Sequence, residues 1–184
     1  MILRRARYRT VPWANGGGIT HDIMVGGNPP LLRVSLAEIA RDGPFSDLAG
    51  YDRTIVLAGG AGFRLTFADG NSVVLGALGD RHDFRGEDAP ACALLDGPVF
   101  AFNVMVLRGA MRAIVDVIDA GTNVVWDEAP GTALFVLDGA VRYGAGMARR
   151  FDTVVLDAGR VPVREAPATL VAVRFSTETP GRRP

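Results

Sequence analysis

The chain reads Phe63-Arg64-Leu65-Thr66-Phe67-Ala68-Asp69-Gly70-Asn71-Ser72-Val73-Val74-Leu75 in the stretch that decides its fold class. Two apolar runs flank a polar segment, in which Gly70 can supply the positive φ of a tight turn. This pattern predicts a hairpin of two antiparallel strands, 63–67 and 72–75. Because comparable runs recur on both sides of it, the hairpin indicates an all-β chain.

Short β-branched or aromatic runs with turn residues between them are typical of a β-sandwich or barrel. We expect further strands at Ile19–Val25, Leu31–Ile39, Thr54–Leu57, Phe100–Leu107 and Met111–Ile118. The last run is long enough for a helix, but its Ile and Val residues favour a strand. A second hairpin is predicted at Asp138-Gly139, between strands 134–137 and 141–143.

A faint repeat with a period of roughly 80 residues runs through the chain. Ile55–Gly59 resembles Phe135–Gly139, and two later pairs of segments follow in the same order. The later pairs are 73–81 with 154–160, and 87–91 with 165–168. This ordered similarity predicts two related β-barrel halves.

Composition excludes several classes of function. The chain has 184 residues, 48% of them hydrophobic, which is enough for one sizeable core or two small barrels. Its 20 basic and 20 acidic residues cancel, so no global field favours nucleic acid or an anionic membrane as a partner. Every basic residue is Arg, which excludes lysine Schiff-base chemistry but leaves many groups that bind carboxylates in a bidentate fork.

Cys92 is the only cysteine, so an intramolecular disulfide cannot form and the chain fits a reducing compartment. Its apolar neighbours favour a buried, unreactive thiol over a nucleophile. No apolar run approaches the roughly 20 residues that span a bilayer, and no apolar stretch follows the basic N-terminal residues. These features predict a cytoplasmic protein.

The stretch Trp13-Ala14-Asn15-Gly16-Gly17-Gly18-Ile19-Thr20 stands where the first long strand is expected to begin. Three consecutive glycines suit a backbone that takes positive φ or lies close against another group. An indole, an amide and a hydroxyl, all groups that recognise ligands, flank them. The stretch alone leaves two interpretations open, a flexible turn and the edge of a binding site.

Two of the expected strands carry polar residues on one face. Alternation along Leu31–Ile39 places Arg33 and Ser35 on the same face, which either lines a wet cavity or meets bulk solvent. Asn103 interrupts the apolar run Phe100–Leu107, so its amide must find a hydrogen-bond partner or face a polar lumen.

Five motifs follow one another along the first half of the chain. They are Trp13-x-Asn15-Gly16-Gly17-Gly18-x-Thr20, Arg33-x-Ser35-x-Ala37, Gly43-Pro44-Phe45-Ser46, Gly50-x-Asp52-Arg53, and Asn103-Val104-Met105 followed by Arg108-Gly109. In this order they resemble the motifs of the HutD/Ves family over about residues 8–110. One departure is Leu32, where many members of the family carry Trp, and we expect it to alter packing beside the pocket more than the chemistry.

The resemblance implies a cupin-like double β-barrel (bicupin) in one compact unit, and an association with histidine utilisation. It also implies that the motif-rich N-terminal barrel, residues 1–109, holds the pocket. Residues 110–184 would then form a smaller C-terminal barrel half.

Cupins often bind a metal through closely spaced His residues and a Glu, but this chain has only His21 and His82 and no His-x-His pair. Each is followed by Asp, and adjacent residues of a strand point to opposite faces. We therefore expect no metal and no cofactor, and the alternative is a site in which His21 and His82 join a carboxylate from another strand. A Ser-His-Asp assembly lacks the Gly-x-Ser-x-Gly elbow, and the glycine run lacks the ending of a phosphate-binding loop.

The leading hypothesis is a metal-independent binding protein for a small anionic metabolite that carries a carboxylate. Arg33 or Arg53 would grip the carboxylate, neutral groups would supply hydrogen bonds, and Trp13 would close over an apolar stem. The association with histidine utilisation makes formylglutamate the ligand to test first. The predicted ligand-binding residues are Trp13, Asn15, Gly16, Gly17, Gly18, Thr20, Arg33, Ser35, Ser46, Arg53 and Asn103.

Two alternatives belong to other classes of protein. The first is a metal-free isomerase, epimerase or hydrolase in which Glu38 or His21 transfers a proton. The second is a structural or interaction module, which predicts a large exposed apolar patch and no ordered polar pocket. A homodimer is compatible with the unpaired strand edges of a small double barrel.

Overall fold

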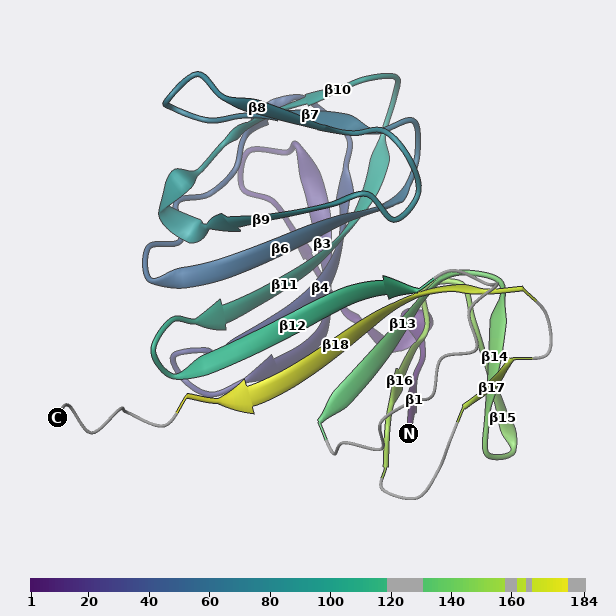
Figure 1. Cartoon of the computed structure of the whole chain (residues 1–184). Coiled ribbons are helices and arrows are strands. Elements are labelled where there is room, and N and C mark those ends of the chain that lie inside the picture. Colours follow the sequence, from purple (N-terminus) through teal and green to yellow (C-terminus); the bar gives the residue numbers. More distant parts are fainter. Residues whose placement is uncertain (119–130, 158–161, 165–166, 179–184) are drawn as a thin grey trace, which may run out of the picture. The chain divides into compact units, whose positions relative to one another are not determined.

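The computed structural model describes residues 1–118, 131–157, 162–164 and 167–178. Its elements are strands apart from two short 3-10 turns, η1 (Arg5–Arg7) and η2 (Gly86–Asp88), so the predicted all-β class is confirmed (Figure 1). In this described part of the chain no helix is long and apolar enough to cross a membrane.

The strands divide into two compact units. One unit contains Met1–Tyr8 together with the described residues of Ala113–Ser176, and the other contains Arg9–Arg112 together with Thr177 and Glu178. Met1–Tyr8 thus lies with the C-terminal strands, because β1 (Ile2–Leu3) pairs with β16 (Thr153–Val155). The barrel boundaries at 1–109 and 110–184 stay a prediction.

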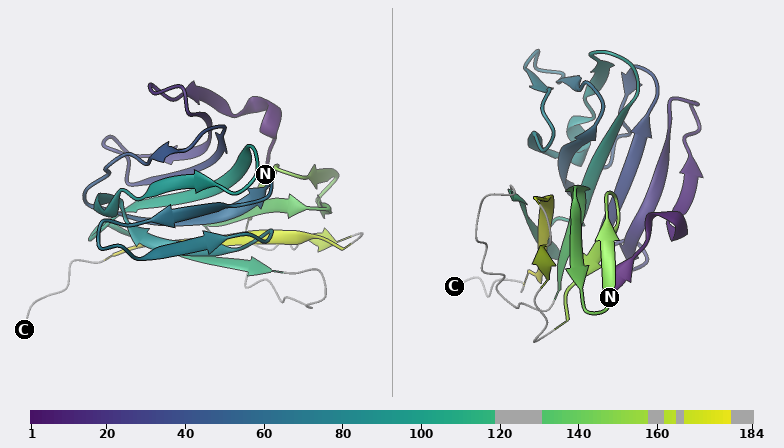
Figure 2. Two further views of the ribbon diagram at one scale, coloured as in Figure 1. Left: turned by 90° about the horizontal axis from the view of Figure 1, so that it is seen from above. Right: turned by 90° about the vertical axis from the view of Figure 1, so that its right-hand side faces the viewer.

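The unit that starts at Arg9 consists of two antiparallel sheets. The larger sheet has the order β2 (Arg9–Pro12), β3 (Gly18–Gly26), β4 (Leu32–Ile39), β11 (Val99–Leu107), β6 (Tyr51–Gly59) and β9 (Arg81–Arg85), whose strands run alongside one another in Figure 2. The smaller sheet has the order β5 (Gly43–Pro44), β10 (Ala91–Leu94), β7 (Phe63–Thr66) and β8 (Ser72–Leu75).

Apolar side chains from both of these sheets share one core. Ile55 and Ala101 come from the larger sheet, and Phe63, Leu65 and Leu75 come from the smaller one. The hairpin predicted from the opening stretch is confirmed, since β7 and β8 pair antiparallel. The side chains of this hairpin form one side of the core.

The second unit has the same two-sheet construction. Its larger sheet has the order β1, β16, β13 (Thr132–Asp138), β18 (Thr169–Thr177) and β12 (Met111–Ile118), and its smaller sheet has the order β15 (Gly146–Arg149), β14 (Ala140–Tyr143) and β17 (Val163–Arg164). The interpretation of 111–118 as a strand is therefore confirmed.

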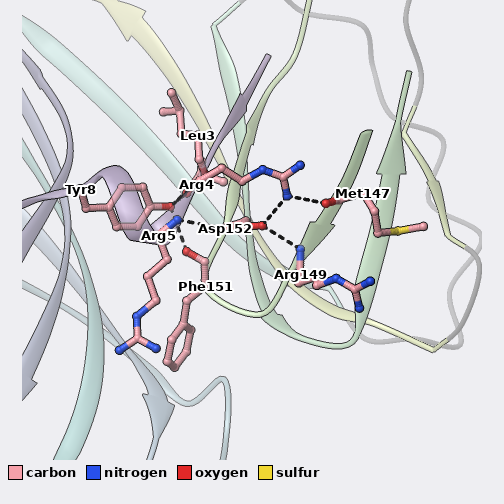
Figure 3. A network of polar contacts seen from close by, with 9 residues as sticks. Leu3, Arg4, Arg5, Tyr8, Met147, Arg149, Phe151 and Asp152 are labelled. Carbon is pink, nitrogen blue, oxygen red and sulfur yellow. Dashed lines mark hydrogen bonds and ion pairs between the residues drawn. The ribbon is translucent and has the colours of Figure 1, made fainter. Parts of the chain in front are cut away.

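The N-terminal segment is fixed to this second unit by a buried carboxylate (Figure 3). Asp152 accepts hydrogen bonds from Arg4 Nη1 at 2.8 Å and from the backbone amides of Arg5 and Arg149 at 3.0 Å each. The Tyr8 hydroxyl donates to the Phe151 carbonyl at 2.9 Å, and burial raises the pKa of Tyr8 well above its usual value. These contacts explain why β1 completes a sheet formed otherwise by strands far along the chain.

The hairpin predicted at Asp138-Gly139 is wrong. β13 and β14 belong to different sheets, because both edges of β13 are already paired with β16 and β18. Gly139 has φ of +80°, and a Cβ there would lie 2.4 Å from the Pro167 carbonyl oxygen. The dipeptide is therefore a corner at which the chain leaves one sheet and enters the other.

The sequence repeat is matched by a repeat in strand pairing. β6 lies between β9 and β11 while β7 lies between β8 and β10, and in the other unit β13 lies between β16 and β18 while β14 lies between β15 and β17. The corners also correspond. Gly60 approaches Pro98 and Val99 as Gly139 approaches Pro167 and Ala168.

Candidate functional site

The unit that starts at Arg9 contains a cavity of about 510 Å³, a volume in the range of metabolite-binding sites. Its lining combines apolar and neutral polar side chains with two arginines. The lining residues are Val11, Trp13, Ala14, Asn15, Thr20, Arg33, Ser35, Ala37, Ile39, Pro44, Phe45, Ser46, Leu48, Arg53, Asn103 and Met105.

Most of the residues predicted to bind a ligand meet in this cavity. Those present are Trp13, Asn15, Thr20, Arg33, Ser35, Ser46, Arg53 and Asn103. Gly16, Gly17 and Gly18, which were predicted with them, are not among the lining residues.

Neighbouring strands of the larger sheet present the polar floor of the cavity. Asn103 on β11 is the register partner of Ser35 on β4, and Met105 is the partner of both Arg33 and Arg53. Ser35, Arg53, Asn103 and Met105 are all buried. The alternation read from the sequence thus turns Arg33 and Ser35 toward the cavity and away from bulk solvent.

Arg53 is the most unusual group of this floor. Arg53 is only 9% exposed, and its Nε and Nη1 atoms are buried without a hydrogen-bond partner among the described residues. The guanidinium carbon lies 4.7 Å from the centre of the Phe84 ring and 5.5 Å from that of Phe45. These rings favour a cation but cannot accept hydrogen bonds as a carboxylate does.

Burial, together with the nearby charge of Arg33, lowers the pKa of Arg53 to about 10. The group is therefore still charged at neutral pH, in a place where its charge is poorly solvated. A buried charge with unused donors is unfavourable unless an opposite charge joins it. An anion in the cavity would supply that partner.

Arg33, the second cavity arginine, already has a carboxylate partner. Its Nε donates to Asp22 Oδ1 at 2.8 Å, and its Nη2 lies 2.7 Å from the same oxygen. Asp22 was considered in the sequence only as a neighbour of His21, and its pairing with Arg33 was not predicted. The register that places Asp22 opposite Ser35 depends on a bulge between Asp22 and Met24, which the sequence pattern does not reveal.

The glycine run forms the turn that places Trp13. The Gly16 amide donates to the Trp13 carbonyl at 3.0 Å, and the Gly17 amide donates to Asn15 Oδ1 at 2.9 Å. A Cβ on Gly18 would lie 2.4 Å from the Glu38 carbonyl oxygen and 3.2 Å from the indole. The amides of Gly16 and Gly17 are thus used within the turn.

Phe45 and Phe84, whose rings contact the Arg53 guanidinium, are not among the site residues predicted from the sequence. Phe45 packs edge-on against Trp13 with ring centres 6.5 Å apart, so it joins the glycine turn to Arg53. Phe45 could have been predicted, because it belongs to the motif Gly43-Pro44-Phe45-Ser46. Phe84 belongs to no motif, and only the pairing of β6 with β9 in the structure places it opposite Arg53.

The motif residues Asp52 and Arg108 lie outside the cavity lining and form exposed ion pairs. Arg108 Nε donates to Asp52 Oδ1 at 2.7 Å, and its Nη1 donates to Glu87 Oε1 at 2.8 Å. The hydrogen bonds from Arg108 lower the pKa of Glu87 to about 2. These exposed ion pairs connect the start of β6, which carries Arg53, with η2.

The cavity lining does not contain the residue types that hold a metal ion in a cupin. Its lining residues include no His, Asp, Glu or Cys. His21, whose Nδ1 lies 3.1 Å from Thr10 Oγ1, and Glu38 are both outside the lining. His82 packs on the rings of Phe67 and Phe84. Across the described residues no group of three or more His, Cys, Asp or Glu could hold a metal ion.

Cys92 on β10 is 3% exposed and belongs to the core between the two sheets. Burial raises the pKa of its thiol to about 12. The predicted buried position is confirmed, and the neutral thiol is a poor nucleophile.

Three comparisons extend these observations. The sequence model of the family described as HutD matches residues 5–175. A Pseudomonas putida protein, described as an uncharacterized 21.2 kDa protein in the hutC 3' region, is 35% identical over 138 residues, which cover 73% of this chain and 72% of that protein.

The structure of HutD from Pseudomonas fluorescens SBW25 is similar, with a TM-score of 0.81 and 26% identity over 97% of this chain and 99% of that one. A cupin 2 conserved barrel domain protein from Leptotrichia buccalis has a TM-score of 0.58 at 14% identity, covering 91% of this chain and 96% of that one. This second likeness concerns the fold alone, and it agrees with the cupin-like architecture.

Proposed function

The chain belongs to the HutD family, and from this premise and its cavity we propose that it binds a small metabolite through a carboxylate. The observation that carries the proposal is Arg53, a buried arginine that lines a metabolite-sized cavity and has two guanidinium nitrogens without a hydrogen-bond partner among the described residues. A carboxylate matches a guanidinium in charge and in hydrogen-bonding geometry.

The rest of the lining suits a ligand with a polar neutral group and an apolar stem. Ser35 and Asn103 are buried beside Arg53 and offer neutral hydrogen-bonding groups. Trp13 is half-buried, and its indole is held by a 2.8 Å hydrogen bond from Nε1 to Thr20 Oγ1. The half-buried indole lines the cavity, and we propose that the part of it facing the cavity packs on an apolar stem.

The family relationship suggests where such a metabolite comes from. The Pseudomonas putida relative is described by its place in the hutC 3' region, and we propose that this chain also acts in histidine utilisation. Formylglutamate, an acyl amino acid with carboxylates, is the first ligand to test. A protein that binds it without turnover would report its level to the pathway.

A thermal-shift panel of histidine-pathway intermediates and simple mono- and dicarboxylates, with and without chelator, tests this function. A ligand that binds only the folded state stabilises it by about 2.7 kcal/mol at one hundred times its dissociation constant. We expect a carboxylate to raise the Tm of the natural chain but not that of Arg53→Gln. The result should be the same with and without chelator. A panel in which no carboxylate shifts the Tm, or in which only added divalent metal does, would contradict the proposal.

A further inference from the structure

Asp22 lies on β3 between an arginine of the cavity and an arginine of the surface. Its side chain is 4% exposed, and its Oδ1 is bonded to Arg33. Its Oδ2 accepts a 2.6 Å hydrogen bond from Arg9 Nη2. The Arg9 side chain is 74% exposed and does not line the cavity, so water screens much of its charge.

The two arginines of the cavity are therefore unequal toward a ligand. Arg33 already directs its Nε and Nη2 to the buried carboxylate of Asp22, whereas two nitrogens of Arg53 have no partner among the described residues. A ligand carboxylate that pairs with Arg53 gives this buried charge an opposite charge and hydrogen-bond acceptors. A second carboxylate would have to displace Asp22 from Arg33 or lie unpaired near Asp22.

We propose that the cavity selects ligands with one carboxylate over otherwise identical ligands with two, and that Asp22 sets this preference by occupying Arg33. The inference rests on the proposed function, because it assumes that a carboxylate binds at Arg53. It narrows the ligand class from carboxylates in general to monoanions whose other polar groups are neutral, so that formylglutamate would bind more weakly than its side-chain amide. Ser35 and Asn103 provide hydrogen bonding for such neutral groups.

Isothermal titration calorimetry at pH 7 with N-formylglutamine and N-formylglutamate tests this preference. The two probes share one skeleton and differ only in a side-chain carboxamide or carboxylate. We expect the natural chain to bind N-formylglutamine about tenfold more tightly, a ratio that corresponds to roughly 1.4 kcal/mol. In Asp22→Asn, Arg33 is released for a second carboxylate, and the ratio should fall by about tenfold.

Arg9→Gln supplies a second variant, which is safer for folding because Arg9 is exposed. Without Arg9, Asp22 pairs with Arg33 alone and neutralises it more completely. The preference for N-formylglutamine should then rise, by about threefold, in the direction opposite to Asp22→Asn. If Asp22→Asn does not fold, the direction of change in Arg9→Gln decides the test.

The outcomes separate the two proposals. Tighter or equal binding of N-formylglutamate by the natural chain overturns the preference for monoanions and leaves the proposed function intact. Ratios that stay the same in the variants overturn the role of Asp22. If the natural chain binds neither probe nor any other carboxylate, the proposed function itself fails.

Discussion

Arg53 shows how a single residue can be unfavourable for folding and useful for binding. Its guanidinium lies against Phe45 and Phe84, and these rings hold its position without supplying a counter-charge. The protein bears the cost of a poorly solvated cation. That arrangement is expected where binding of an anion compensates for the cost, because strain and desolvation are retained at functional sites.

The lowered pKa of Arg53, about 10, predicts how ligand binding depends on pH. A carboxylate binds the charged guanidinium, so its affinity should be constant from about pH 6 to 9 and fall about tenfold per pH unit above about pH 10. In the same alkaline range Arg53 binds fewer protons in the folded state than in the unfolded state, so its own contribution to stability rises with pH, whereas the raised pKa values of Tyr8 and Cys92 make their contributions fall.

Titration calorimetry across this pH range checks the prediction. In Arg53→Lys the fall in affinity should begin at a lower pH, because an ammonium group has the lower ordinary pKa and is subject to the same burial. An affinity that is already declining between pH 6 and 8 in the natural chain would show that another group controls binding.

At the scale of elements, local patterns predicted strands well and pairing only in part. Alternation of side chains correctly placed Arg33 and Ser35 on one face of β4, because the faces of a strand follow from a period of two. The turn at Gly70 was read correctly as a hairpin. The turn at Gly139 has similar chemistry but joins two sheets, since β13 already has partners on both edges. The residues of a turn do not reveal whether the strand before it is already paired on both edges with strands from elsewhere in the chain.

Gly139 and Gly70 provide a matched test of this difference. Both have positive φ, +80° and +85°, but only Gly139 lies against backbone that a Cβ would meet. Gly139→Ala should therefore lose more free energy of unfolding than Gly70→Ala, which is expected to lose about 1–2 kcal/mol for its left-handed conformation alone. Gly60→Ala should behave like Gly139→Ala, because both glycines stand at equivalent corners.

Urea unfolding of the three variants measures these differences. Equal losses for Gly139→Ala and Gly70→Ala would show that the close approach to Pro167 does not fix the corner.

For the whole molecule, the sequence was sufficient for the all-β class, the family and eight of the sixteen residues that line the cavity. Five motifs far apart in the chain lie around one cavity, as the family resemblance implied. The electrostatic character of the site was not predictable, because the pairing of Asp22 with Arg33 depends on a bulge in β3. The isolation of Arg53 depends on the packing of Phe84 from β9. Homodimerisation and a cytoplasmic location stay predictions.

The central claim is that a carboxylate pairs with Arg53, and the Nε–H signals of arginine in ¹⁵N-labelled protein test it directly. The Arg53 signal is assigned by its loss in Arg53→Lys. On addition of a carboxylate ligand that raises the Tm, this signal should shift and exchange more slowly with water. The signal of Arg108, whose Nε already donates to Asp52, should stay unchanged. An Arg53 signal that does not move at saturating ligand would contradict the account.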